Sequence, residues 1–329
     1  MVKKLTHPNE RAINPLIKRY KSRDWDGLRT TWTDLLRENG EAAFEWINDP
    51  DIAFPILYSL APELADVHDN LTVKHQMAIN HIFSVLNGDP FGIIEGMDLL
   101  DQYHYCVECF EWMIRSGGLE TVDSQYPYVI DHACDLLLHH FHHDCLQDIV
   151  DILFYRNRSG GQRHYILSTF YNAANPIGLI YVAKYLRSKD AKDIAFAKSI
   201  LSFIPDVVST PPLESESRVL TWLEENRDYL IYTYETNDSH PHPEPFRIHY
   251  PAKYLGIPID HTSGSFLYPL GESFEKRYQD FQALPLHFQK QLSAYSLQLR
   301  RTNRGLWYQW IAEPLNTQVT ILQQRGWPL

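Results

Sequence analysis

A histidine-rich segment, residues 132–145, holds the residue types best suited to metal chemistry. On an ideal α-helix of about 3.6 residues per turn, four of its side chains fall in one stripe: His132, Asp135, His139 and His143. Neighbours along the stripe are spaced so that a pair such as His139 and His143 could bind one divalent ion. The stripe also lies opposite the apolar face, where an amphipathic helix places solvated polar residues. We interpret it as a polar surface, with a site for zinc or another divalent metal as the alternative.

The four cysteines all lie between residues 106 and 145, and two of them form the pair Cys106-Val-Glu-Cys109. Redox-active pairs of this spacing lie at a helix N-terminus, where free backbone N–H groups lower a thiol pKa. Here the surrounding apolar pattern places the pair in the middle of a helix. A zinc site would need a second close pair, and Cys134 and Cys145 are not one. We expect buried, unreactive cysteines in a reducing, intracellular setting.

A basic and aromatic stretch near the C-terminus supplies the second group of candidate binding residues. These are Arg300, Arg301, Arg304, Trp307 and Trp310. Arginine beside aromatic rings can bind a peptide or stack on single-stranded nucleic acid. The net charge of −11 opposes nucleic-acid binding over any broad surface. We expect the two tryptophans to anchor a helix in a core, with a protein-binding patch and a nucleic-acid site as alternatives.

Motifs of the common enzyme classes are absent from the sequence. It contains no glycine-rich nucleotide loop, no GxSxG, no HExxH and no protein-kinase signature. We therefore assign no catalytic residue and no cofactor apart from the metal considered above. The protein is expected to be a binding protein rather than an enzyme.

Apolar residues recur at helical spacing over the first 236 residues, and alternating strand patterns are nearly absent. The expected helices in the second half of this region cover residues 144–155, 161–172, 176–186, 190–203 and 214–234. After residue 270, helices are expected at 272–284, 285–301 and 306–324, the last broken at Pro314.

Prolines mark the expected helix starts at intervals close to the length of a helix pair. They are Pro15, Pro50, Pro90, Pro127, Pro176 and Pro211. Several follow an Asn or Asp that could cap the first turn. Because helical-hairpin repeats of the HEAT type run to about 35–47 residues, the spacing favours stacked hairpins. We predict an all-α protein, an irregular α-α superhelix of HEAT-like stacked hairpins, with an irregular helical bundle as the alternative.

The composition changes near residue 237. Residues 239–270 contain six Pro and four His together with many aromatic and aliphatic residues. Such proline density prevents long helices, but the segment is too apolar for a free linker. We therefore predict three parts: a helical-repeat domain over 1–236, an extended, docked arm over 237–270, and a small C-terminal helical unit over 271–329 packed on the first domain.

The predicted architecture indicates the class of function. Apolar residues make up 44% and charged residues 22%, as in ordinary globular proteins. No apolar segment indicates a signal peptide or membrane span, so we expect a cytoplasmic protein without a membrane partner. Because helical stacks present extended concave surfaces, we expect a scaffold, adaptor or inhibitor that binds a protein or peptide. A metal-dependent enzyme using the stripe at 132–143 is the alternative, and a nucleic-acid binder using residues 300–310 is the third.

Overall fold

The computed structural model describes residues 13–92, 99–236, 240 and 243–324. Residues 237–239, 241 and 242 of the predicted arm lie outside the described residues. The chain is 68% helical, which confirms the all-α class, and the described residues contain a single small sheet of two strands. Within the described ranges, no helix is both long and apolar enough to cross a lipid bilayer.

The chain divides into two units, residues 1–169 and 170–329, and one helix, α10, crosses the boundary. The elements up to this boundary are α1 (Pro15–Lys21), α2 (Trp25–Glu38), α3 (Gly40–Ile47), α4 (Phe54–Ser59), α5 (Ala61–Ala65), η1 (His68–Asn70), α6 (Val73–Leu86), α7 (Leu99–Gly117), α8 (Tyr126–Asp135), the π-helical turn η2 (Leu136–His140), α9 (Leu146–Ser159) and α10 (His164–Asn172).

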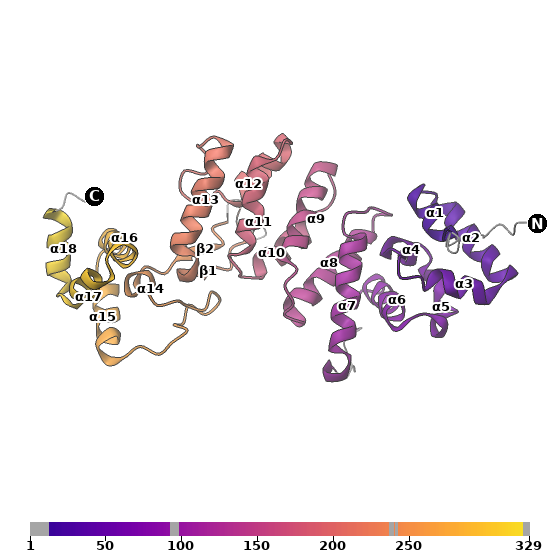
Figure 1. Cartoon of the computed structure of the whole chain (residues 1–329), viewed down its shortest axis with the longest axis horizontal. Helices are drawn as coiled ribbons and strands as arrows, with labels where there is room; N and C mark the ends of the chain where they lie inside the picture. The colour runs from indigo at the N-terminus through magenta and orange to yellow at the C-terminus, as the bar shows by residue number, and fades with distance from the viewer. Residues whose placement is uncertain (1–12, 93–98, 237–239, 241–242, 325–329) are drawn as a thin grey trace, which may run out of the picture. The chain divides into compact units, whose positions relative to one another are not determined.

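In the first unit, consecutive helices pack side by side from α1 to α3 and again from α4 to α8 (Figure 1). The first three helices pack together, and α6, α7 and α8 form a second group against which α4 lies. Aromatic rings fill the core beneath α4: the ring of Phe54 lies 5.9 Å from that of Trp112 and 5.7 Å from that of Tyr126. Burial of such large rings contributes strongly to stability because each removes a wide apolar surface from water.

The elements of the second unit are shorter and more varied. They are α11 (Gly178–Lys184), η3 (Tyr185–Arg187), α12 (Ala191–Ile200), α13 (Pro212–Asn226), η4 (Arg227–Tyr229), β1 (Leu230–Tyr232), β2 (Phe246–Ile248), α14 (Tyr250–Leu255), α15 (Glu272–Gln282), α16 (Leu286–Thr302), α17 (Arg304–Ala312) and α18 (Leu315–Gln324). The two strands pair antiparallel, with Ile231 opposite Arg247.

A core of aromatic residues joins the C-terminal helices of the second unit. Helix α14 packs against α15 and α16, and α17 and α18 pack against α16 (Figure 1). The rings of Tyr254 and Phe281 are stacked with centroids 4.2 Å apart, and Trp307 and Trp310 belong to the same core. The segment around α14 is therefore packed with the last helices of the chain.

The prediction of one helix over residues 214–234 is wrong in its second half. Helix α13 ends at Asn226, and residues 230–232 form β1. The Asn226 side chain turns back and donates a hydrogen bond from Nδ2 to the carbonyl of Trp222, 2.7 Å away. A side chain that bonds to the preceding turn competes with the helical backbone pattern, and this favours termination. The chain then extends and pairs with residues 246–248.

Candidate functional site

The histidine-rich segment is not one continuous helix, so the prediction that carried the helix through residue 143 is wrong. Helix α8 ends at Asp135, and a wider π-helical turn continues to His140. His142 then adopts a left-handed backbone conformation with φ of 51°, which ends the helical path. His143 therefore lies beyond the helix, and its Nε2 is 2.8 Å from Oε1 of Glu111 on α7.

The remaining three residues of the predicted stripe stay on one helical segment. Nε2 of His139 lies 3.7 Å from Oδ1 of Asp135, and Nδ1 of His132 lies 3.0 Å from the hydroxyl oxygen of Tyr165. Burial lowers the pKa of His132 and raises that of Asp135, and the attraction between opposite charges opposes both shifts. Across the described residues, no group of three or more His, Cys, Asp or Glu side chains is placed to hold a metal ion. The metal hypothesis stays a prediction.

All four cysteines are buried, and none of them forms a disulfide bond. Cys106 and Cys109 lie in the middle of α7, and burial raises the pKa of Cys106 to about 11 and that of Cys145 to about 12. The thiolate is the reactive form of cysteine, so these environments suppress nucleophilic and redox chemistry at neutral pH.

The predicted basic and aromatic binding residues do not form one surface. Trp307 and Trp310 are only 6% and 5% exposed, in the core of the C-terminal helices. Arg300 is half-buried, whereas Arg301 and Arg304 are exposed. Trp310 lines a small hollow of about 210 Å³, and Arg301 lines a different and larger one. The nucleic-acid hypothesis for this stretch stays a prediction.

The larger hollow is built around Lys253, which lies in the short helix α14. The helix begins at a cap in which Nδ1 of His249 accepts the backbone N–H of Ala252 at 3.0 Å. It ends at Gly256, whose φ of 72° suits glycine and where any side chain would collide with Arg300. Arg300 in turn donates from Nη2 to the carbonyl of Lys253 at 2.7 Å, which fixes the backbone that carries the lysine.

The ammonium group of Lys253 is buried and has no ion-pair partner among the described residues. The residue is 6% exposed, and its Nζ donates to Oδ1 of Asn226 at 2.6 Å. Among the described residues, no carboxylate lies within ion-pair distance of this nitrogen. Burial lowers the pKa of Lys253 to about 8, with Glu225 opposing this shift and Arg300 and Arg301 adding to it. Lys253 is therefore mostly protonated at pH 7 although it is buried.

Two separate hollows of about 360 Å³ each share Glu225 as a lining residue, and we call them together the groove. The Lys253 hollow is lined by Glu225, Lys253, Ala294, Leu297, Gln298, Arg301 and Thr302. The Trp222 hollow is lined by Pro205, Asp206, Ser217, Arg218, Thr221, Trp222 and Glu225. Each volume lies near the lower end of the range for ligand pockets, about 300–1,000 Å³.

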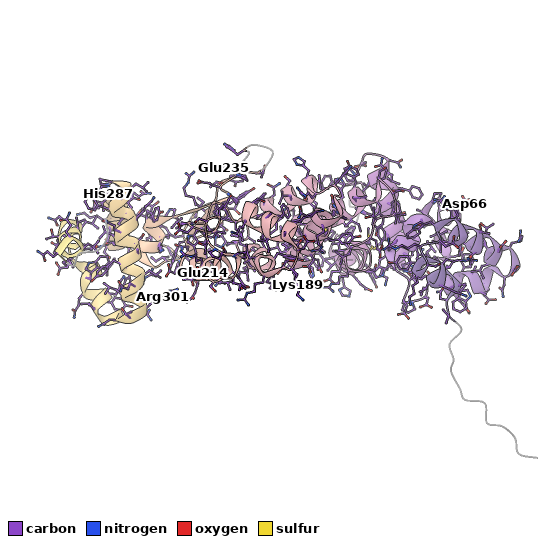
Figure 2. The ribbon with its side chains drawn as sticks, turned by 90° about the horizontal axis from the view of Figure 1, so that it is seen from above. Asp66, Lys189, Glu214, Glu235, His287 and Arg301 are labelled. Atoms are coloured by element: carbon purple, nitrogen blue, oxygen red, sulfur yellow. The ribbon has the colours of Figure 1, made fainter. Side chains whose placement is uncertain are left out.

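Charged side chains in the groove are paired except for Lys253. Nη1 of Arg301 lies 3.6 Å from Oε1 of Glu225, and its Nη2 lies 3.2 Å from Oε1 of Glu224. Figure 2 shows Arg301 at the surface of the C-terminal helices. In the Trp222 hollow, Arg218 lies 3.5 Å from Asp206. The groove can therefore bind an apolar group against its walls and a negative charge beside Lys253.

Sequence reasoning identified Arg301 but missed Lys253, Asn226 and Glu225. A lysine between Ala252 and two buried apolar residues is a weak signal of burial, but its partners lie on helices far away in the sequence. No protein-family model matches the chain, and no curated protein or solved structure matches it either.

Proposed function

We propose that this protein is a helical scaffold that binds a partner protein, acting as an adaptor or inhibitor, and that the groove receives a segment of that partner. The observation that carries this proposal is the pair of hollows that share Glu225 as a lining residue. Adjacent hollows of this size suit an extended segment that places successive side chains in each. Apolar walls from Trp222 and Leu297 beside charged residues match the anatomy of protein interfaces, with an apolar centre and a polar rim.

The proposal includes the finer architecture and the compartment. The consecutive packing of α1 to α3 and of α4 to α8 supports a HEAT-like arrangement of helical hairpins. The absence of a disulfide bond among Cys106, Cys109, Cys134 and Cys145 supports a reducing compartment, and we propose that the protein is cytoplasmic.

Affinity purification followed by a titration tests the proposal. The untagged partner recovered in stoichiometric amount from native lysate is identified, purified and titrated against the protein. Thr221 is exposed on α13 and lines the Trp222 hollow, so Thr221→Trp fills that hollow without disturbing a core. We expect this variant to weaken binding by at least about tenfold, because losing a well-packed interface group costs about 1–2 kcal/mol.

A matched variant shows whether weaker binding results from filling the groove or from adding a large side chain anywhere on the surface. Thr320 is exposed on α18 and lines neither hollow of the groove, so Thr320→Trp should leave the affinity within about twofold of the original. The proposal fails if no stoichiometric partner is recovered, or if the partner binds Thr221→Trp as tightly as the unchanged protein.

A further inference from the structure

We infer that the Lys253 hollow is a binding site for a single carboxylate group, carried by the segment that occupies the groove. This inference rests on the proposed function for the source of the carboxylate, and it names the chemistry that the partner must present. The inference is based on the ammonium group of Lys253. This group is almost fully buried, and among the described residues it has a hydrogen bond but no ion pair.

A buried cation without a counter-charge is costly, because water no longer solvates it. Asn226 satisfies one of the three donors of the ammonium group through its Oδ1. The two other donors have no hydrogen-bond partner among the described residues. Lys253 lines a hollow of about 360 Å³, which is large enough to admit a carboxylate and the carbon atoms that bear it. A ligand oxygen placed there would convert the desolvated charge into a charge-assisted hydrogen bond.

The charges of the hollow favour a monoanion. Its walls contain two cations, Lys253 and Arg301, and one anion, Glu225. The excess is one positive charge, which one carboxylate neutralises. A phosphate dianion would leave the hollow with a net negative charge and would also be repelled by Glu225. Glu224 contacts Arg301 from outside the hollow, but its side chain is 73% exposed, so solvent and salt screen its effect.

The helix that forms one wall of the hollow must also be considered, because a helix C-terminus repels anions. Helix α16 ends at Thr302, and the lining residues Ala294 to Thr302 belong to its last turns. Arg300 and Arg301 lie in the last turn and offset the partial negative charge of the free carbonyl groups. Gln298 adds amide N–H donors on the same wall.

Competitive chemical labelling of Lys253 tests the inference without any partner. The whole protein is methylated with trace formaldehyde and a borane reductant at pH 7, digested, and analysed by mass spectrometry. Lys189, exposed in the same unit, serves as the internal reference (Figure 2). The probes are N-acetylglycine, which has a chain-terminal carboxylate, and the α-amide of N-acetylaspartic acid, in which the side-chain carboxylate is the only acidic group.

Either carboxylate probe should slow methylation of Lys253 by about tenfold relative to Lys189. A carboxylate beside the amine raises its pKa, and a rise of about one unit reduces the reactive neutral form about tenfold. N-acetylglycinamide, the neutral counterpart, should leave the ratio unchanged. The two carboxylate probes distinguish a chain terminus from an acidic side chain as the preferred source.

A substitution of Arg301 tests the contribution of the second cation while Lys253 remains available for methylation. Arg301→Gln removes an exposed charge from the wall and should weaken the protection of Lys253 by about tenfold, as expected for a charge-assisted hydrogen bond. Arg304→Gln is the matched control, because Arg304 is exposed and does not line the hollow. Circular dichroism verifies that both variants stay folded.

Several results would overturn the inference. These are equal protection by the neutral amide, stronger protection by inorganic phosphate than by either carboxylate, undiminished protection in Arg301→Gln, or no protection by either probe up to its solubility. Protection by a carboxylate when no partner is recovered would instead leave the site standing and defeat the scaffold. A partner whose binding is blocked by Thr221→Trp but which does not protect Lys253 from methylation would support the scaffold and defeat the carboxylate site.

Discussion

The buried ion pair between Asp131 and Arg156 allows a stability prediction with a defined pH dependence. Nη1 of Arg156 lies 2.6 Å from Oδ1 of Asp131, and the two side chains are 7% and 5% exposed. Arg156 also donates to the backbone carbonyls of Pro127 and Gln162. Burial raises the pKa of Asp131 to about 6, and the nearby guanidinium group opposes that rise. Arg156→Met removes the charge while keeping an extended side chain.

The loss of stability should be large at alkaline pH and smaller near pH 6. At about pH 8 the variant must either bury a carboxylate without its partner or bind a proton to avoid doing so, and breaking a buried pair in this way costs about 3–5 kcal/mol. Without Arg156 the pKa of Asp131 rises further, so above about pH 6 the native variant keeps a proton that the original protein has lost. The difference in unfolding free energy then grows by about 1.4 kcal/mol per pH unit up to the variant's pKa.

The sign follows from proton binding. A carboxyl whose folded pKa is raised stabilises the fold at acid pH and loses that contribution as the pH rises through its folded pKa. That loss occurs between about pH 4 and 6 in the original protein and continues to higher pH in the variant. We therefore expect a loss of about 1–2 kcal/mol near pH 6. His75 and His81, whose pKa burial lowers to about 4, titrate alike in both proteins and cancel from the difference.

Urea unfolding followed by far-ultraviolet circular dichroism at both pH values measures these differences. Arg37→Met is the control, because Arg37 pairs with Asp34 at the surface and its side chain is 71% exposed. It should cost less than about 1 kcal/mol at either pH. The double variant Asp131→Asn, Arg156→Met should recover most of the loss at pH 8. An Arg156→Met loss that is the same at both pH values would refute the reasoning.

Three further predictions concern the candidate elements of the sequence. Phe141→Ala should cost about 3–5 kcal/mol in urea unfolding, because the ring is 2% exposed, and a loss below about 1 kcal/mol would contradict its core position. Changing His139 and His143 together to Gln should shift the free energy of unfolding by less than about 0.5 kcal/mol. Elemental analysis of the protein should find no stoichiometric metal, and a bound metal would favour the enzyme alternative. Residues 243–270 should resist limited proteolysis because Tyr254 is buried, so rapid release of a C-terminal fragment would contradict docking.

Strongly periodic helices could be predicted from the sequence with useful accuracy. The predicted break at Pro314 separates α17 from α18, and Glu313 before it is extended, as steric contact with the proline ring requires. Asn14 caps α1 as expected, with Oδ1 accepting the backbone N–H of Leu16 at 3.0 Å. Asp49 instead stabilises a turn through Asp51, and α4 begins only later. A capping residue before proline therefore indicates a turn of the chain but not always a helix.

The candidate site depended on contacts that the sequence does not reveal. Lys253 lies in a proline-rich stretch whose sequence predicts an extended segment without long helices, yet Tyr250 to Leu255 form the short helix α14. Its hydrogen-bond partner Asn226 lies at the end of α13, and Arg300, which fixes its backbone, lies on α16. The sequence places Arg300 among the candidate binding residues because its neighbours are basic and aromatic. Its actual role is set by tertiary contacts with Tyr229 and Lys253.

The four buried thiols have a consequence for measuring this protein. All of them lie within residues 106–145, so the first unit holds every cysteine and the second holds none. A thiol reagent can reach them only when the first unit opens, and the labelling rate therefore reports the free energy of that opening. Occupation of the groove, which lies in the second unit, changes this rate only if the stabilities of the two units are coupled. The labelling rate of these four cysteines therefore measures how strongly the stabilities of the two units are coupled.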